Sequence, residues 1–393
     1  FRIGKMFPGY SDAYIEPSSA QDERYSFIAE WYDPQAALIR RYQFLYYPKD
    51  SSIEMFDIKN RRKFLSRTKF ESVRLEDLYI GSKVSIYSRQ LTFVDFGDQF
   101  TESKLISKKE KTFALIKPDA TSKLGVILNG LRDRNIKVTK AQMVQMTRTD
   151  AVKFYDEHQS KPYFNSILEY ITSGPVIAME IVGSGVVQKW LEMLGPSDPS
   201  EARTSNPKSI RAMFGTDELK NTAHGSINAT AAAKELEFFF PSSGAAFVGT
   251  AKYENSTCCV IKPHAVKEGL VGDIISVIMD AGFDITALSM QTVQKANAEE
   301  FYEIYKGVVA EYKSMVDELC NGSCVVLEIS GNDQDVPSKF RQLCGPSDPE
   351  IGRHLRPKTL RAMFGKDAIQ NAVHCTDLPE DGILEVEYFF RIL

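Results

Sequence analysis

Two histidines stand at equivalent places in a repeated stretch of the sequence. Residues 221–226 read Asn-Thr-Ala-His-Gly-Ser, and residues 371–376 read Asn-Ala-Val-His-Cys-Thr, which puts His224 and His374 in register. An imidazole can take up a phosphoryl group and pass it on, so that one difficult transfer becomes two easier steps. A lone histidine is more often a packed or capping residue. Because two of the five histidines fall at equivalent positions, we interpret them as candidate nucleophiles.

Charged and hydrogen-bonding residues recur around each histidine in the same order. Each repeat supplies a lysine, one or two arginines, an asparagine, the histidine and a glutamate. The chain has no Gly-x4-Gly-Lys-Ser/Thr loop and no Gly-x-Gly-x-x-Gly turn, which disfavours a Walker or Rossmann site. A nucleotide site would therefore be built from side chains, and arginine forks suit the oxygens of a transferring phosphoryl group.

Residues 112–240 contain the elements that would position the first histidine. The pattern predicts strands near 112–117, 136–147, 176–182 and 235–240. It predicts helices over about 122–133, from 150 to 158, over 186–194 and over 229–234, with a loop at 206–215. The order βαββαβ is that of a ferredoxin-like α+β fold, with paired helices on one side of an antiparallel sheet.

The same plan returns after a linker at 241–256 that is rich in Ser, Gly and Ala. Residues 257–393 repeat the strand that ends in Lys-Pro, and they predict a helix over 272–282 that ends at glycine. The sequence thus predicts two tandem domains, 112–240 and 257–393, with one core each.

Residues 1–111 have a different character. Short aromatic-rich runs are broken by turn residues, which predicts a small β-rich module, either a barrel or a curled sheet. Its basic clusters, Arg40-Arg41 and Arg61-Arg62-Lys63, are typical of a solvated strand edge, where positive charge blocks edge pairing. Alternatively they form a docking face for an acidic partner. The module carries 19 basic and 16 acidic residues, a net charge of +3 in a chain of net charge −4.

Composition excludes several classes of protein. An apolar content of 43% with 25% charged residues is that of a soluble globular protein. No apolar run reaches 18 residues, so we expect no membrane-spanning helix. The small net charge does not call for nucleic acid or an anionic membrane, and we expect no DNA partner. The cysteines show no reliable metal spacing and are expected to be free thiols; they are Cys258, Cys259, Cys320, Cys324, Cys344 and Cys375.

Four motifs taken together resemble nucleoside diphosphate kinases. They are the strand ending in Lys-Pro-Asp at 117–119, the turn Leu-Gly-Pro-Ser-Asp-Pro at 194–199, the segment Ile-Arg-Ala-Met-Phe at 210–214, and Asn-x-x-His-Gly-Ser. The resemblance covers residues 112–240 and 257–393. It implies a ping-pong reaction in which His224 takes the γ-phosphoryl group of a nucleoside triphosphate and passes it to a nucleoside diphosphate. Mg²⁺ would accompany the nucleotide, and no protein metal site is implied.

The resemblance also implies roles for individual residues. Glu235 and Ser226 would orient the imidazole of His224. The nucleotide would be bound in the first domain by Lys117, Tyr155, Tyr163, Ser197, Arg211 and Asn221. In the second domain, the matching residues are Lys262, Tyr302, Arg341, Ser347, Arg361, Asn371, His374 and Glu385.

Each domain departs from the family pattern. In the first, Leu191 and Lys161 stand where the family has arginines, and a lost charged donor to a phosphate costs ~1.5–3 kcal/mol. In the second, Arg341 is present, but Cys375 and Thr376 replace Gly and Ser, and a Cβ at residue 375 is expected to crowd the backbone beside the histidine. We expect the first domain to be the more active. The alternative is a retained fold that has lost its chemistry and serves as a structural unit.

Residues of about 20–110 resemble, more diffusely, the DM-ten module of ciliary and axonemal proteins. This likeness implies a second role, in which the chain binds tubulin, the microtubule doublet or other axonemal proteins, with the γ-tubulin ring complex as a further candidate. The expected location is then the cytoplasm and cytoskeleton, in the ciliary axoneme, with the centrosome as a further candidate. The sequence leaves base preference and oligomeric state open.

Overall fold

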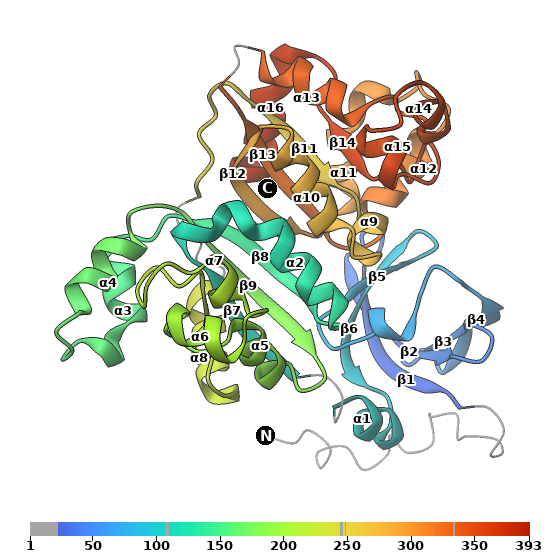
Figure 1. Ribbon diagram of the computed structural model, residues 1–393. Coiled ribbons are helices and arrows are strands. Elements are labelled where there is room, and N and C mark those ends of the chain that lie inside the picture. Colours follow the sequence, from blue (N-terminus) through green and yellow to red (C-terminus); the bar gives the residue numbers. More distant parts are fainter. Residues whose placement is uncertain (1–22, 107–109, 244–246, 248, 333–334) are drawn as a thin grey trace. The chain divides into compact units, whose positions relative to one another are not determined.

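The computed structural model describes residues 23–106, 110–243, 247, 249–332 and 335–393 (Figure 1). The chain divides into two compact units, 1–107 and 108–393, and each is described by itself. Residues 1–22 of the expected N-terminal module, and part of the expected linkers around 108 and 244–248, lie outside the described residues.

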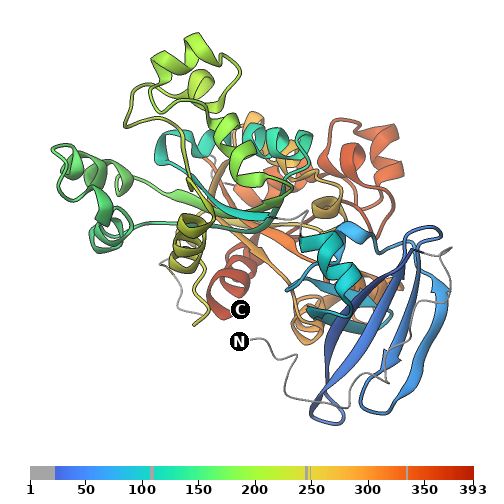
Figure 2. The same ribbon diagram turned by 90° about the horizontal axis from the view of Figure 1, so that it is seen from below.

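The first unit is a six-stranded antiparallel sheet with strand order β4-β3-β2-β1-β6-β5 (Figure 2, blue). The strands are β1 (Tyr25–Asp33), β2 (Leu38–Tyr47), β3 (Ser52–Asp57), β4 (Arg62–Lys69), β5 (Lys83–Ile86) and β6 (Arg89–Phe96). A short turn η3 (Leu75–Asp77) and the helix α1 (Gln99–Ile106) complete it. Aromatic residues of neighbouring strands fill its core, with Phe27 and Phe44 each packed against Phe93.

The sheet is curled. Phe64 of β4 packs against Tyr42 with 4.7 Å between ring centroids and an angle of 41° between the ring planes. The guanidinium of Arg89 in β6 lies 5.0 Å from the rings of both Phe64 and Trp31. Side chains from the edge strand β4 therefore meet side chains from the opposite half of the sheet. The β-rich module expected from the sequence is confirmed as a curled sheet.

The second unit contains both repeats. Domain A runs from β7 to α8. Its elements are β7 (Glu110–Ile116), η4 (Pro118–Lys123), α2 (Leu124–Asp133), β8 (Lys137–Val144), α3 (Arg148–Phe154), η5 (Asp156–His158), α4 (Phe164–Ile171), β9 (Val176–Gly183), α5 (Val186–Leu194), α6 (Pro199–Ser205), α7 (Ile210–Phe214), β10 (Ala223–Gly225) and α8 (Ala229–Phe239).

Domain B repeats this order from β11 to the C-terminal turn. Its elements are β11 (Ser256–Ile261), α9 (Pro263–Lys267), α10 (Val271–Asp280), β12 (Asp284–Gln291), α11 (Lys295–Phe301), η6 (Glu303–Tyr305), α12 (Tyr312–Leu319), β13 (Cys324–Ser330), α13 (Val336–Cys344), α14 (Pro349–Leu355), α15 (Leu360–Phe364), β14 (Val373–Cys375), η7 (Pro379–Asp381), α16 (Gly382–Glu387) and η8 (Tyr388–Ile392).

Both domains have the predicted βαββαβ plan, but the fourth strand was misplaced in the prediction. Residues 235–240 belong to α8 rather than to a strand, and the three-residue strand β10 carries the histidine instead. The buried residues Ala232, Leu236 and Phe239 recur with a helical period, and that period sets the conformation of this aromatic-rich run. The expected loop at 206–215 also contains a helix, α7, which Ser209 caps.

Helices cover both faces of the sheet, which corrects the expectation of helices on one side. Along β7, Phe113 and Leu115 pack with residues of α3, α4 and α8. The alternate residues Ala114 and Ile116 pack with α2 and α5. Since successive side chains of a strand point to opposite faces, each domain is a three-layered structure.

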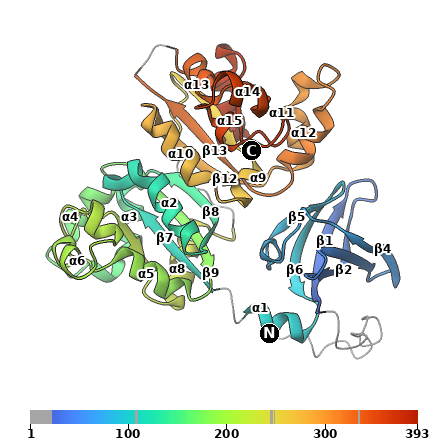
Figure 3. The same ribbon diagram turned by 45° about the vertical axis from the view of Figure 1, so that its right-hand side comes forward.

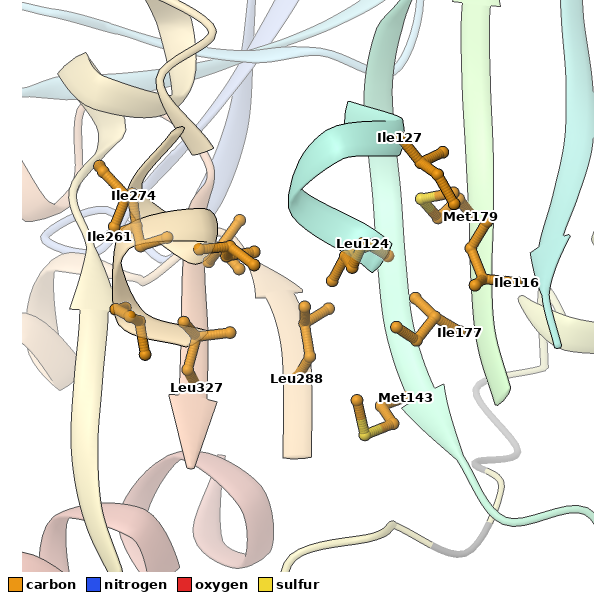
Figure 4. Packing of buried hydrophobic residues seen from close by; sticks show 14 of the residues in the cluster. Ile116, Leu124, Ile127, Met143, Ile177, Met179, Ile261, Ile274, Leu288 and Leu327 are labelled. Carbon is orange, nitrogen blue, oxygen red and sulfur yellow. The ribbon is translucent and has the colours of Figure 1, made fainter. Parts of the chain in front are cut away.

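The two domains share one sheet and one core. The eight strands run β10-β7-β9-β8-β12-β13-β11-β14, and Gln142 of β8 pairs with Ser289 of β12 where the domains meet. One cluster of buried apolar residues continues through both halves, from Ile116 and Met179 to Leu288 and Leu327 (Figure 4). The prediction of one core for each domain is therefore incomplete, because each domain has a core of its own on one face and contributes to a common core on the other.

Helices α2 and α10 lie side by side over this junction (Figure 3). Asp273 of α10 accepts hydrogen bonds from the Asn129 amide at 2.7 Å and from Arg132 at 2.5 Å, both on α2. In the described part of the chain, no helix combines the length and apolar character needed to cross a membrane.

Candidate active sites

In domain A, a carboxylate holds the candidate nucleophile. His224 lies on β10, and its Nε2 is 3.0 Å from Oε1 of Glu235 on α8. Ser226 donates to the other carboxylate oxygen at 2.5 Å. A carboxylate that accepts from Nε2–H leaves Nδ1 as the ring nitrogen with the free lone pair. Glu235 and Ser226 thus orient the imidazole of His224 so that Nδ1 is the nitrogen available to a ligand.

The helix α8 explains how Glu235 reaches His224 across eleven residues of sequence. Asn228 caps the helix by accepting from the backbone N–H of Ala231 at 2.8 Å, and the chain turns back along β7. Rings of Phe113 and Phe154 pack against the imidazole at centroid distances of 6.2 and 5.6 Å. The helix and the rings together fix the orientation of the His224 side chain.

A second cluster joins three of the predicted nucleotide-binding residues. Lys117 Nζ donates to Asn221 Oδ1 at 2.6 Å and to the carbonyl of Leu219 at 3.1 Å. The Asn221 amide donates to the carbonyl of Ser197 at 2.9 Å. Burial and, to a smaller extent, the charge of Arg211 lower the pKa of Lys117 to about 8.

Arg211 hydrogen-bonds to the backbone next to His224. Its Nη1 donates to the carbonyl of Gly195 at 2.8 Å and its Nη2 donates to that of Ala223 at 3.1 Å. Its Nε is buried without a partner among the described residues. Burial lowers the pKa of Arg211 to about 10, a cost that a bound anion would offset.

The two tyrosines predicted to bind the nucleotide in domain A, Tyr155 and Tyr163, differ in burial. Tyr155 is buried beside Phe154, and burial followed by the charge of Glu235 raises its pKa. Tyr163 is exposed, and its hydroxyl lies 3.4 Å from Nδ1 of His158. Leu191, which occupies the place of a family arginine, packs against the common core.

Sequence reasoning missed the support beneath Asn221. Asp119, from the quoted Lys-Pro-Asp motif, accepts from the hydroxyl of Tyr170 and from the backbone N–H of Thr222 at 3.1 Å. Thr222 has a left-handed backbone conformation, with φ of 76°, which is unusual for a β-branched residue. Asp119 therefore stabilises the bend that brings Asn221 and His224 into the same site.

Domain B replaces this support with different residues. His264 stands at the place of Asp119, and its Nδ1 lies 2.8 Å from Glu318 Oε1. The backbone N–H of Ala372 donates to His264 Nε2 at 3.2 Å, and Ala372 again has a left-handed conformation, with φ of 69°. The same bend is thus held by a different pair of polar side chains.

The candidate catalytic residues of domain B match those of domain A, except that His374 and Thr376 share one oxygen of the glutamate. His374 Nε2 is 2.9 Å from Glu385 Oε2, and Thr376 donates to that oxygen at 2.8 Å. Thr257 on β11 donates to the Thr376 hydroxyl at 2.9 Å. The His374 side chain is 7% exposed and that of His224 is 28% exposed, so the two rings differ in their access to solvent.

A pocket of about 960 Å³ opens over His374. It brings together all the nucleotide-binding residues predicted for domain B, namely Lys262, Tyr302, Arg341, Ser347, Arg361 and Asn371. Arg356 also lines it and was not predicted, although it stands where domain A has Asn206. Burial, then the charge of Arg361, lowers the pKa of Lys262 to about 8.

Arg341 belongs to a polar group that domain A lacks. Its Nη2 lies 3.3 Å from Asp377 Oδ1, and Tyr305 donates to Asp377 Oδ2 at 2.5 Å. The corresponding residues in domain A are Leu191, Ile227 and His158, of which only His158 can ionise. The arginine that domain B retains is thus accompanied by an acidic partner.

The expected crowding at Cys375 is absent for a specific reason. A Cβ at Gly225 of domain A would lie 2.4 Å from Trp190 Nε1 and 3.0 Å from Leu194 Cδ1. In domain B, the smaller Phe340 and Cys344 occupy the places of Trp190 and Leu194. The glycine in domain A is therefore required by its neighbours rather than by its backbone angles, and domain B has changed all three residues together.

Two protein-family models match the chain. A family model described as nucleoside diphosphate kinase matches residues 110–244 and 255–392. The chain belongs to the nucleoside diphosphate kinase family. A second model, described as the nucleoside diphosphate kinase 7 N-terminal PH domain, matches residues 19–107, so the relation extends to the N-terminal module.

The chain is similar to particular proteins over all or part of its length. The chain is 55% identical to nucleoside diphosphate kinase homolog 7 of Mus musculus over 390 residues, which covers 98% of each chain. It is 34% identical to a thioredoxin domain-containing protein 3 homolog of Heliocidaris crassispina over 283 residues, which are 72% of this chain and 32% of that protein. A crystal structure of the Aquifex aeolicus nucleoside diphosphate kinase is 37% identical, covering 36% of this chain and 99% of its own, with a TM-score of 0.33.

Proposed function

We propose that domain A transfers the γ-phosphoryl group of a nucleoside triphosphate to a nucleoside diphosphate through His224. The observation that carries this proposal is the hydrogen bond from His224 Nε2 to Glu235, with Ser226 on the second carboxylate oxygen. It leaves the Nδ1 lone pair of a partly exposed ring to act as the nucleophile.

The reaction would proceed in two steps. Nδ1 attacks the γ-phosphorus, the bond to the β-phosphate oxygen breaks, and the nucleoside diphosphate leaves with that oxygen. The imidazole now carries a phosphoryl group on Nδ1 and a proton on Nε2, and the Glu235 carboxylate stabilises the positive charge that develops on the ring. A second nucleoside diphosphate then attacks the phosphohistidine in the reverse direction.

Cations of the site would balance the charge of the phosphates. Lys117 and Arg211 lie on the segments that surround His224, and both are partly desolvated before a ligand binds. Among the described residues, no group of three His, Cys, Asp or Glu side chains is arranged to hold a metal ion. Mg²⁺ would arrive as part of the nucleotide substrate, bound mainly by phosphate oxygens and water.

For domain B, we propose nucleotide binding, with slower transfer through His374. The pocket gathers Lys262, Arg341 and Arg361 around the histidine, which favours a polyphosphate ligand. The smaller exposure of the His374 ring favours domain A for the transfer itself.

Acid-labile labelling tests this proposal. The full chain is incubated with γ-³²P-labelled ATP and Mg²⁺, and label on the protein is measured before and after mild acid. We expect acid-labile label that His224→Ala removes for the most part and His374→Ala leaves largely intact, and transfer of that label to added ADP. Absence of label on either histidine would contradict the proposal.

A second candidate function is docking on an acidic surface, with the kinase domains as structural units. The supporting observation is the edge strand β4, whose side chains are almost all exposed and include Arg62, Lys63, Arg67 and Lys69. An acidic microtubule surface, in the ciliary axoneme or at the centrosome, is the partner that the module's resemblance suggests. Some of these cations are paired within the module, Lys63 with Glu54 and Arg67 with Asp50, which lowers their attraction for a distant partner.

Co-pelleting of the full chain with microtubules tests this second function. We expect binding that falls with rising salt and that the double change Arg61→Glu and Arg62→Glu weakens. The matched control is Lys208→Glu, at an exposed position in domain A. Equal binding by all three proteins would exclude the basic start of β4, Arg61 and Arg62, as the docking element.

A further inference from the structure

Three thiols of domain B meet behind the candidate nucleotide pocket. Cys259 lies on β11, Cys344 ends α13 and Cys375 lies on β14, and all three are buried in the common core. Cys259 and Cys375 stand directly opposite each other in the β11–β14 ladder. Cys344 belongs to the same buried cluster, and at the equivalent places of domain A a Cβ on Gly225 would lie 3.0 Å from Leu194 Cδ1, so these two positions are adjacent in the fold. The sequence indicated free thiols at these positions but not their proximity.

Arg361 holds the two segments that carry Cys344 and Cys375. Its Nη1 donates to the carbonyl of Gly345 at 2.9 Å, and its Nε donates to that of Val373 at 3.1 Å. Its Nη2 lies 3.5 Å from Cys375 Sγ. One guanidinium therefore fixes the residue after Cys344, fixes β14 two residues before Cys375, and places positive charge against the Cys375 sulfur.

This environment separates Cys375 from the other thiols. The neighbouring Cys344 thiol and the charge of Arg361 outweigh burial and lower the pKa of Cys375 to about 6. Burial raises the pKa of Cys259, and burial together with the neighbouring Cys375 raises that of Cys344. The thiolate is the reactive form of cysteine, and Cys375 is the thiol of this cluster whose surroundings favour it.

The pocket extends as far as Cys375, which is 1% exposed. Cys375 lines it between His374 and Thr376, and Arg361 lines it as well. In domain A, Gly225 stands at the place of Cys375 and Leu194 at the place of Cys344. All six cysteines of the chain lie beyond residue 257. Any thiol chemistry at this place is therefore a property of domain B alone.

We propose that Cys375 and Cys344 form a reversible thiol–disulfide pair at the base of the domain B pocket, with a hydroperoxide as the oxidant. The Cys375 thiolate attacks the terminal peroxide oxygen, an S–O bond forms, the O–O bond breaks, and the alkoxide or hydroxide leaves and takes up a proton. The Cys344 sulfur, which gives up its proton, then attacks the sulfenic sulfur of Cys375, and hydroxide leaves as water. Two thiols are oxidised to one disulfide, and one hydroperoxide is reduced.

The disulfide would also affect the pocket. Arg361 loses the anionic sulfur that it contacts, and β14 is drawn toward the end of α13 one residue from His374. We therefore expect oxidation to weaken nucleotide binding in domain B and to leave domain A unchanged. This consequence rests on the proposed nucleotide-binding function, whereas the disulfide itself does not.

Peptide mass spectrometry tests the disulfide directly. The full chain is treated with hydrogen peroxide, digested without reductant and compared with a sample reduced by dithiothreitol. We expect a cross-linked peptide that joins Cys344 to Cys375 and that dithiothreitol removes. In Cys344→Ser, dimedone should trap a sulfenic acid on Cys375, and Cys375→Ser should show neither product. The matched control is Cys320→Ser, a buried cysteine of α12's end outside the cluster, which should behave as the unchanged chain does.

The outcomes separate this proposal from the nucleotide function. Absence of both the cross-link and the dimedone adduct, or a cross-link between Cys259 and Cys375, would overturn the proposed pair, whatever the nucleotide results. ADP binding is measured by calorimetry on the oxidised and reduced chain, with His224→Ala and His374→Ala as references for each site. Loss of the domain B binding on oxidation supports the coupling. A cross-link with unchanged binding supports the thiol pair and overturns its effect on the pocket.

Discussion

Gly125 of α2 and Gly272 of α10 face each other so closely that neither position has room for a methyl group. A Cβ on either residue would lie 2.7 Å from the carbonyl oxygen of the other. Each is the second residue of its helix, so the relationship is reciprocal between equivalent positions of the two domains. The shared core is thus closed by backbone contact between the two helices.

Replacing Gly125 by alanine should separate these helices. Because the methyl group meets backbone rather than a flexible side chain, we expect overpacking to lower the free energy of unfolding by about 1–3 kcal/mol. The control is Gly130→Ala on the same helix, where the added Cβ would meet only the Met193 methyl at 3.3 Å. Alanine is the better helix former, so that change should be neutral or stabilising. Urea unfolding of both variants measures the difference, and equal stabilities would contradict the close packing.

Gly225→Cys should destabilise domain A, although the equivalent cysteine is accommodated in domain B. The new Cβ would meet the Trp190 ring at 2.4 Å, which we expect to cost about 1–3 kcal/mol of unfolding free energy. Adding Trp190→Phe and Leu194→Cys copies the domain B neighbours and should recover most of the loss. Thermal unfolding of the single and triple variants measures the recovery. A triple variant no more stable than Gly225→Cys would show that these neighbours are not what makes room in domain B.

Glu235→Gln should slow phosphohistidine formation on His224 without unfolding domain A. The amide keeps the shape of the side chain but lacks the charge that stabilises a cationic imidazole, and loss of such assistance typically costs about 10²-fold or more. Ser226→Ala removes one hydrogen bond to the same carboxylate but leaves its charge beside the imidazole, and should therefore have a smaller effect on the rate. Single-turnover labelling with ATP compares the two. An equal loss in both variants would indicate that positioning, not charge, is what Glu235 supplies.

Nucleotide binding in domain A should weaken as the pH rises from 7 to 9. With a pKa of about 8, Lys117 is charged below this range and largely neutral above it, so its attraction for phosphate is lost on the alkaline side. Lys117→Arg keeps the charge and should remove much of this dependence. ADP affinity measured by calorimetry, with Lys262→Met in both proteins to suppress domain B, gives the comparison. An unchanged pH profile in Lys117→Arg would exclude Lys117 as the titrating group.

The lowered pKa of Lys117 makes folding stability rise with pH, whereas it makes nucleotide binding fall with pH. Burial places the pKa of Lys117 below its ordinary value of 10.5, so the unfolded chain binds the proton more tightly. Lys117 therefore contributes a free energy of unfolding that is greatest above pH 10.5 and that is lost as the pH falls toward 8.

Much of the fold could be predicted from local patterns. Apolar runs flanked by Gly and Pro located β7 and β9, and the helix predicted over 186–194 coincides with α5. The resemblance to nucleoside diphosphate kinases implied Glu235 as the partner of His224, and the repeat placed Glu385 at the matching position beside His374; both contacts are present.

Other features depend on contacts that a single sequence does not reveal. The strand β10 has only three residues, too few to show a period, while the aromatic run that ends α8 has the composition of a strand. The pairing of Gln142 with Ser289 leaves no local signal. The replacement of Asp119 and Tyr170 by His264 and Glu318 is understandable only after both pairs are seen to support the same bend.

The ladder between β8 and β12 joins two parts of one covalent chain, and this has a consequence for how the two sites can change. A tether keeps such a contact at an effective concentration of roughly millimolar or above, so dilution does not dissolve it. If two identical chains formed the same contact, each substitution would be present in both chains, and both sides of the contact would have to accommodate it. In this chain, Cys375 and Asp377, the acidic partner of Arg341, had to fit only into domain B. Substitutions in domain B could therefore accumulate without any matching change in domain A.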